Sequence, residues 1–140
     1  MSLKFEGIRL ISINAGYFNR GAAVTIPGLG IITGSKSRQC RALISHEFGH
    51  ILQYRRWGFI FYWTRIAPAS LLSARKANKT NTYNHMDCWT EWSANLLSYR
   101  YFGKPENWDL QKYPVSPPGK DTSGLPEYIR QINDHNIEVG

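Results

Sequence analysis

The stretch His46-Glu47-Phe48-Gly49-His50 decides the interpretation of this 140-residue chain. Residues at i and i+4 lie on the same face of a helix, so His46 and His50 can bind one metal ion. Glu47 follows His46 and can reach a water molecule at an open position of that ion. Two imidazole ligands, a Lewis-acidic ion and a base beside the water are the parts of zinc-assisted hydrolysis. The alternative, which we do not favour, is a surface helix with two unrelated histidines.

The composition is that of one globular domain spanning residues 1–140. A hydrophobic content of 42% and an aromatic content of 14% are enough for a packed core and exclude a disordered chain. The net charge of +7 favours acidic partners, among them nucleic acid, anionic lipid and acidic peptides. Since the basic residues look scattered, charge alone does not predict a nucleic-acid site, and nucleic acid is not the partner we favour.

The two cysteines do not indicate a disulfide scaffold. Neither Cys40 nor Cys88 belongs to a C-x-x-C pair, so a cysteine-rich zinc site is excluded. We expect two buried free thiols, with pairing between them left open. Residues 1–7 are too polar for a signal peptide, and the apolar run at 59–74 is interrupted by an arginine and a proline. We therefore expect no transmembrane segment and favour a cytoplasmic location.

The first third of the chain has the composition of β-strands. Strands are expected at 8–13, 22–26 and 29–33, with Pro27-Gly28 as the turn between the last two. Helices follow, so we predict an α+β fold: a small N-terminal sheet, a helix that carries the two histidines, and a second ligand-bearing helix. An exposed edge of the sheet can bind an extended peptide, although a plain hairpin is the interpretation that we favour.

The first of these helices is expected over 38–57, a stretch without proline. Ser35 or Ser37 can cap its start, and Gly58 is placed to end it. Gly49 in its interior costs about 1 kcal/mol relative to alanine. Its presence indicates that something crosses close to this part of the helix.

The segment after this helix, 58–74, is apolar and aromatic, and we expect it to pack into the core. The other interpretation is an interfacial membrane segment at 55–66, because Arg55, Arg56 and Arg65 flank the aromatic side chains. We do not favour this peripheral membrane contact.

The second helix is expected over 88–101, with Asp87 as its cap. The metal-binding core then extends over 34–103. The tail, 104–140, is rich in proline and glycine and is expected to wrap the domain surface, with one short helix at 126–133.

The third metal ligand is a separate question, because a catalytic zinc usually has three protein ligands and one open position. Glu91 is the candidate we favour, since it lies on the second helix with Asn95 one turn later. The side-chain carbonyl of Asn95 can accept the second N–H of a ligating histidine. His85, Asp87 and His135 remain the other candidates.

Several short motifs between residues 40 and 103 carry a family resemblance. They are His46-Glu47-x-Gly49-His50-x-x-Gln53, Ser70-Leu71-Leu72-Ser73-Ala74, His85-x-x-x-Trp89-x-Glu91-x-x-Ala94-Asn95 and Tyr101-Phe102-Gly103. Together they resemble a gluzincin-type zinc metallopeptidase, and more narrowly the short zincin-like domains common in Bacteroidetes. The resemblance implies a minimal zincin-like domain with a Zn²⁺ site of His46, His50 and Glu91. It also implies Glu47 as the general base.

Two features depart from that family's thermolysin-like branch. The gap between His50 and Glu91 is much longer here. Asn95 stands where that branch has an aspartate, which weakens the polarisation of the histidine ligand.

The activity that we expect is zinc-dependent hydrolysis of peptide bonds, with a peptide or protein as substrate. Glu47 takes a proton from the attacking water and delivers it to the leaving amine. For the oxyanion, His85 is the first candidate donor and Tyr83 the second, although His85 is equally compatible with a plain loop position. Two alternatives remain open: a zinc-binding module without catalysis, and a basic zincin that acts near nucleic acid.

Overall fold

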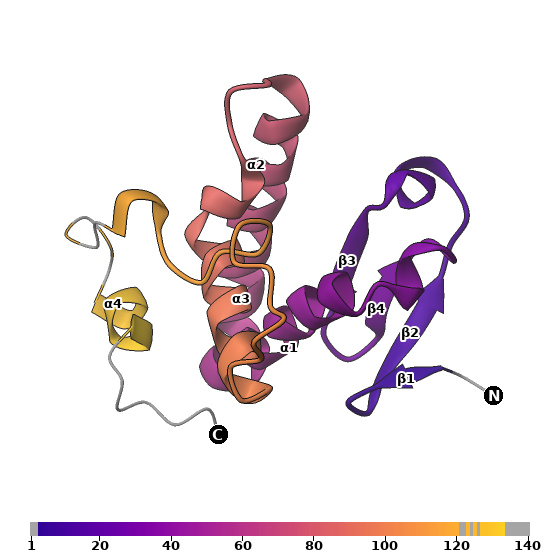
Figure 1. The fold of residues 1–140 in the computed structure, drawn as a ribbon, viewed down its shortest axis with the longest axis horizontal. Coiled ribbons are helices and arrows are strands. Elements are labelled where there is room, and N and C mark those ends of the chain that lie inside the picture. The colour runs from indigo at the N-terminus through magenta and orange to yellow at the C-terminus, as the bar shows by residue number, and fades with distance from the viewer. Residues whose placement is uncertain (1–2, 121–122, 124, 126, 134–140) are drawn as a thin grey trace.

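The computed structural model describes residues 3–120, 123, 125 and 127–133, and its fold is α+β. A small mixed sheet is followed by a long helix and further helices (Figure 1). The strands are β1 (Lys4–Phe5), β2 (Ile8–Ser12), β3 (Ala23–Ile26) and β4 (Gly30–Thr33). The helices are α1 (Arg41–Phe61), α2 (Ala67–Lys79), α3 (Trp89–Tyr101) and α4 (Glu127–Asn133), with the π-helical stretch η3 (Tyr62–Ile66) joining α1 to α2. The 3-10 turns are η1 (Gly16–Arg20), η2 (Ser37–Gln39), η4 (His85–Asp87) and η5 (Pro118–Lys120).

The described sheet has the strand order β1-β2-β4-β3. β2 and β4 run parallel, with Ile11 opposite Ile32, whereas the other two pairs are antiparallel. β3 is therefore an edge strand, and its buried Thr25 contacts Glu47 of α1. The three strands expected from the sequence are confirmed to within one residue at each end, while the two-residue β1 was not expected.

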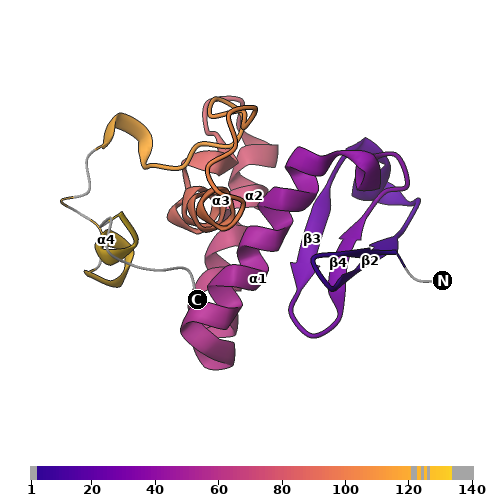
Figure 2. The same ribbon diagram turned by 60° about the horizontal axis from the view of Figure 1, so that its bottom comes forward.

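Helix α1 lies between the sheet and α3 (Figure 2). Its buried side chains, such as Ile44 and Phe48, share a core with Trp92 of α3. At Gly49 the two helices approach closely, because a Cβ there would lie only 2.6 Å from the carbonyl carbon of Ala94. The expectation that something crosses close to Gly49 is confirmed, and it is the backbone of α3 that crosses.

The start of α1 differs from the expectation. The 3-10 turn η2 occupies the residues before it, so α1 begins at Arg41 rather than at 38. Cys40 is in the N-cap position, and no side chain caps the helix. The expectation that Ser35 or Ser37 caps α1 is therefore wrong, because Ser37 is part of η2 and Ser35 precedes it.

Helix α3 also starts without the expected cap. Cys88 occupies its N-cap position without a side-chain hydrogen bond, so the expectation for Asp87 is wrong. The local cap acts one turn earlier, where the Met86 amide donates to Oδ1 of Asn84 at 3.0 Å and starts η4.

Gly58 breaks α1 with φ 85° and ψ 175°, but the chain becomes helical again at once and continues through η3 into α2. The expected helix end is thus a kink. The segment after Gly58 packs into the core only in part. Tyr62 and Ile66 are buried, as expected. The core-packing expectation is wrong for five exposed side chains, Phe59, Ile60, Trp63, Leu71 and Leu72. No helix among the described residues is long and apolar enough to cross a bilayer.

The remaining expectations concern the cysteines and the tail. Cys40 and Cys88 are free, but Cys40 is exposed at the start of α1, so the expectation of a buried thiol is wrong there. Helix α4 packs onto the domain, with Ile129 in the core and the ring of Tyr128 against Phe61 and Trp89. The candidate ligand at position 135 lies outside the described residues.

Candidate metal centre

Three donor atoms meet between α1 and α3. The Nε2 atoms of His50 and His46 lie 3.0 Å and 3.2 Å from Oε2 of Glu91. The donor atoms all lie within 4.8 Å of one another, a spacing that can hold a metal ion. All three side chains are buried. The sequence named the same three residues: α1 supplies both imidazoles one turn apart, and Glu91 faces them from the first turn of α3.

The ring of His46 is oriented by a side-chain amide. Its Nδ1 lies 2.6 Å from Oδ1 of Asn95, and Nδ2 of Asn95 donates to the carbonyl of Pro114 at 2.9 Å. Because the amide nitrogen is used as a donor to Pro114, the amide oxygen faces the ring and accepts a hydrogen bond from Nδ1–H. Nε2 of the neutral ring then keeps its lone pair for a metal.

The ring of His50 is oriented in the same way from its own helix. Its Nδ1 lies 2.8 Å from Oε1 of Gln53. Nε2 of Gln53 donates to the carbonyl of Thr90 at 2.7 Å and to the hydroxyl of Ser93 at 2.8 Å, so the amide orientation is again fixed. Gln53 belongs to the first motif noted in the sequence, but its hydrogen bond to His50 was not predicted, although its position three residues after a candidate ligand was a usable signal.

The second oxygen of Glu91 is bound on the side away from the two imidazoles. Oε1 lies 3.1 Å from Nε2 of His85, and it accepts hydrogen bonds from Ser70 of α2 and from Thr90. These contacts leave Oε2 facing the imidazoles of α1. Ser70 belongs to one of the motifs noted in the sequence, but nothing in the sequence showed that α2 would reach this carboxylate.

The charges of these buried groups act strongly on one another. Burial lowers the pKa of His50, but the charge and hydrogen bond of Glu91, together with the charge of Glu47, outweigh it and raise the pKa to about 9. Burial raises the pKa of Glu91, but the charge of His50 and the hydrogen bonds from the histidines hold it well below its usual range. Positive charge is therefore strongly favoured beside Glu91.

Glu47 borders the donor atoms and is held by the sheet. Its Oε1 lies 4.0 Å from Nε2 of His46, and its Oε2 lies 2.7 Å from the hydroxyl of Thr25. The same hydroxyl is 2.9 Å from the backbone carbonyl of Glu47 and has one proton to donate. Whether this proton is donated to the carboxylate or to the backbone carbonyl, Thr25 of edge strand β3 holds Glu47 in position. Sequence reasoning missed Thr25, because a strand pattern does not tell which neighbour a side chain contacts.

The two expected oxyanion donors lie behind Glu91. Nδ1 of His85 is 2.8 Å from the hydroxyl of Ser73, which is 2.8 Å from the hydroxyl of Tyr83. A chain of hydrogen bonds therefore leads from Tyr83 through Ser73 and His85 to Oε1 of Glu91. The structure does not bring Tyr83 to the donor atoms, and His85 contacts the group through Glu91. Asp87 is exposed and is not part of the group.

Two buried tyrosines lie around the centre. Burial, together with the charges of Glu47 and Glu91, raises the pKa of Tyr62 in η3. The ring of Tyr113 lies 5.7 Å from the ring of His46, between centroids, and burial above all raises its pKa to about 12. Both hydroxyls thus stay protonated at neutral pH and can donate hydrogen bonds. Neither tyrosine was named from the sequence, since nothing local marks them.

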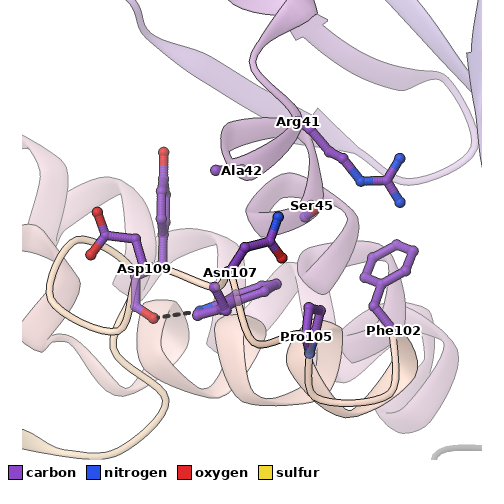
Figure 3. Close-up of a pocket in the computed structure, with 9 residues that line it drawn as sticks. Arg41, Ala42, Ser45, Phe102, Pro105, Asn107 and Asp109 are labelled. Carbon is purple, nitrogen blue, oxygen red and sulfur yellow. Dashed lines mark hydrogen bonds between the residues drawn. The ribbon is translucent and has the colours of Figure 1, made fainter.

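A cavity of about 310 Å³ lies beside the centre. Its walls come from the first turns of α1, including Ser45, and from the segment after α3 (Figure 3). Arg41 and Asp109 lie on opposite sides of it, which gives the cavity one positive and one negative end. Tyr113 lines the cavity and also contacts the ring of His46, so a group bound here would lie next to the centre.

Comparison of the chain with protein-family models, with curated proteins and with solved structures finds no match.

Proposed function

We propose that this chain is a zinc-dependent peptidase in which His46, His50 and Glu91 hold a Zn²⁺ ion. The observation that carries the proposal is the orientation of the donors. Both Nδ1 atoms face carbonyl acceptors, so both Nε2 atoms face Oε2 of the carboxylate. Two imidazoles and one carboxylate form a donor set that suits zinc and leaves a position open. When bound, zinc lowers the pKa of a water molecule toward about 7 and polarises a carbonyl group.

Glu47 supplies the proton transfers in this proposal. It takes the proton of the attacking water and gives it to the leaving amine. The hydroxyl of Thr25 binds one carboxylate oxygen, so the other stays directed toward the donor atoms. Because Glu47 is buried, few bulk water molecules compete for this exchange.

The oxyanion needs a neutral donor close to the centre. Tyr62 and Tyr113 meet this requirement, because burial keeps both phenols protonated. His85 and Tyr83, the donors expected from the sequence, have polar atoms engaged with Glu91 and Ser73. We therefore favour Tyr62 and Tyr113 over His85 and Tyr83 as donors to the oxyanion.

A peptide is the substrate that the surroundings favour. In the part of the chain that the structure describes, no strand pairs with the outer edge of β3, next to Glu47. An extended peptide can add to such an edge. The cavity beside Tyr113 can then accept one of its side chains. The resemblance to gluzincin-type metallopeptidases agrees with this assignment.

The burial of the centre favours a second candidate function, a metal-binding module without catalysis. His46, Glu47 and His50 are each no more than 6% exposed, and Glu91 is fully buried. Structural zinc sites are closed, whereas catalytic sites keep an open position. Measurement of zinc alone does not separate the two functions, so activity must be measured as well.

The first test is the zinc content per chain, measured by plasma mass spectrometry on protein purified without a metal-affinity step. Near-stoichiometric zinc that falls in Glu91→Ala, but not in the matched surface variant Glu106→Ala, supports the ligand set. Equal zinc in all three proteins would overturn it.

The second test is cleavage of a diverse peptide library. Glu47→Gln should keep its zinc and lose about 10²–10⁴-fold in rate. Full activity of this variant would exclude Glu47 as the base. Full zinc occupancy without cleavage by the wild-type protein would leave the metal-binding module as the function.

A further inference from the structure

One arm of the fold has an unusual charge balance. We use "the arm" for residues 51–84, which comprise the second half of α1, η3, α2 and the loop that follows. The arm contains no aspartate or glutamate. Its basic residues are Arg55, Arg56, Arg65, Arg75, Lys76 and Lys79. Six of the 17 basic residues therefore lie on a helical arm that carries no acidic residue, and the α2 end of this arm projects beyond the rest of the molecule in Figure 1.

The same arm exposes large apolar side chains. Phe59 is 64%, Ile60 76%, Leu71 62% and Leu72 65% exposed. Trp63 is partly exposed as well, and its ring lies 6.4 Å from that of Phe59. Clusters of exposed apolar groups on a protein surface mark interaction sites, whereas single ones are ordinary.

The orientation of α2 explains why its leucines are exposed. Ser70 and Ser73 turn toward Glu91 and His85 and so define the inner side of the helix. At 100° per residue, the opposite side carries Leu71, Leu72, Arg75 and Lys79. All four are exposed, and we call them the outer face of α2. This face carries two leucines followed by two basic residues, and exposed apolar and basic side chains together are typical of a helix that lies at a membrane surface.

The sequence disfavoured a membrane contact because it predicted that these apolar side chains are buried, and their exposure removes that reason. We propose that the arm docks onto an anionic lipid membrane surface. The apolar side chains would enter the boundary between head groups and acyl chains, and the basic side chains would contact the anionic head groups. Phe59 and Trp63 suit this boundary, where aromatic rings are enriched. Both the exposed apolar groups and the absence of acidic residues are thereby accounted for.

Other occupants fit less well. A second copy of the arm would bring two basic, acid-free surfaces together, and like charges repel. Nucleic acid would satisfy the basic residues and could stack on Phe59 and Trp63, but it would leave Ile60, Leu71 and Leu72 without a role, because these side chains offer neither hydrogen bonds nor flat rings. The docking proposal is independent of the metal centre, because the outer face of α2 points away from Glu91.

The test is co-sedimentation of the purified full chain with lipid vesicles. Vesicles of phosphatidylcholine with about one third phosphatidylserine should bind the protein, whereas pure phosphatidylcholine should not, and added salt should weaken binding. The double variant Ile60→Ser/Leu72→Ser should bind at least tenfold more weakly. The matched control Tyr17→Ser/Leu110→Ser removes exposed apolar groups outside the arm and should bind like the wild type.

A second pair of variants separates the charge contribution. Arg75→Gln should weaken binding roughly fivefold, the effect of one basic residue near an anionic surface. Arg9→Gln, an exposed arginine of β2, should have no effect. All substituted side chains are exposed, so the fold should be kept, which circular dichroism can verify.

Several outcomes would overturn the proposal. One is the absence of binding to anionic vesicles at low salt. Another is equal binding by the Ile60→Ser/Leu72→Ser variant, which would reduce the effect to non-specific charge attraction. Salt-dependent binding to duplex DNA without binding to vesicles would assign the arm to nucleic acid. Dimers in light scattering that disappear in the same variant, with no vesicle binding, would assign it to self-association.

Discussion

Replacing Gly49 by alanine tests the close approach of α1 and α3, on which the metal centre depends. The added Cβ would lie 2.6 Å from the carbonyl carbon of Ala94, and closer still to its carbonyl oxygen. Cβ atoms essentially never come within 3.0 Å of another heavy atom, and here the obstacle is backbone. The clash therefore cannot be relieved by rotating a side chain, and the two helices must separate.

The expected magnitude follows from two opposing effects. Overpacking of a core costs about 1–3 kcal/mol, and the upper end applies because a backbone must move. Alanine gains about 1 kcal/mol over glycine inside a helix. The free energy of unfolding should thus fall by about 2 kcal/mol. Separation of the helices also moves Glu91 away from His46 and His50, now 3.2 Å and 3.0 Å from its Oε2. We expect zinc affinity to fall about tenfold or more.

Two assays and one control separate these effects. Urea unfolding of chelator-treated protein gives stability, and competition with a chelating dye gives zinc affinity. Gly34→Ala is the matched control, because its Cβ also meets a backbone carbonyl, that of Phe18, with 3.1 Å to the carbonyl carbon. It should lose stability but keep its zinc affinity. Wild-type behaviour of Gly49→Ala in both assays would refute the α1–α3 contact. Equal losses of affinity in both variants would refute the ligand-displacement argument.

Four further predictions concern the centre. Thr25→Val should lower kcat for peptide hydrolysis about tenfold at unchanged zinc content, because Glu47 loses its anchor, and Thr25→Ser should restore the rate; an active Val variant would remove that role. Asn95→Ala should weaken zinc binding about 10–100-fold in dye competition, and an unchanged affinity would contradict the orientation argument. Tyr62→Phe should lower kcat about 10²-fold at constant zinc, whereas an unchanged kcat would exclude its phenol as the oxyanion donor. In chelator-treated protein, the raised pKa of His50 adds stability that is complete below its ordinary pKa of 6.5 and is lost as pH rises toward about 9. The stability of zinc-loaded protein should instead rise with pH over this range, because metal binding needs neutral imidazoles. Thermal unfolding of both forms between these pH values checks the two opposite trends.

The local part of the centre could be predicted from the sequence. His46 and His50 lie one turn apart on one helix, so their spacing alone brings them together. Glu91 could be named because the second helix carries few other charges, and Asn95 follows one turn later. Contacts between distant elements could not be predicted in this way. Thr25 reaches Glu47 from a strand 22 residues earlier, and only the strand order places that strand at the edge beside α1.

The arm shows a second limit of sequence reasoning. Gly58 correctly marked a break, with its positive φ, but a break does not determine whether the next turn is helical. The apolar composition of the following segment predicted burial, since aromatic and aliphatic side chains are usually inside. Their exposure depends on which side of α2 faces the core, and the contacts of Ser70 and Ser73 with α3 and η4 fix that side. A pattern within one segment does not contain this information.

The ligands lie on two helices, but part of the network that positions them and Glu47 comes from other elements of the chain. Strand β3 positions Glu47, Ser70 of α2 binds Glu91, and the carbonyl of Pro114 fixes the amide of Asn95. A peptide with the sequence of α1 alone would contain both histidines but none of these contacts, so we expect it to bind zinc much more weakly. Because Glu91 and the amide that orients His46 are held in part by α2 and by the segment after α3, zinc affinity should report the packing of these elements as well as that of α1 and α3. Variants that keep all three ligands but move the helices that carry them, such as Gly49→Ala, are for this reason sharper tests of the structure than removal of a ligand.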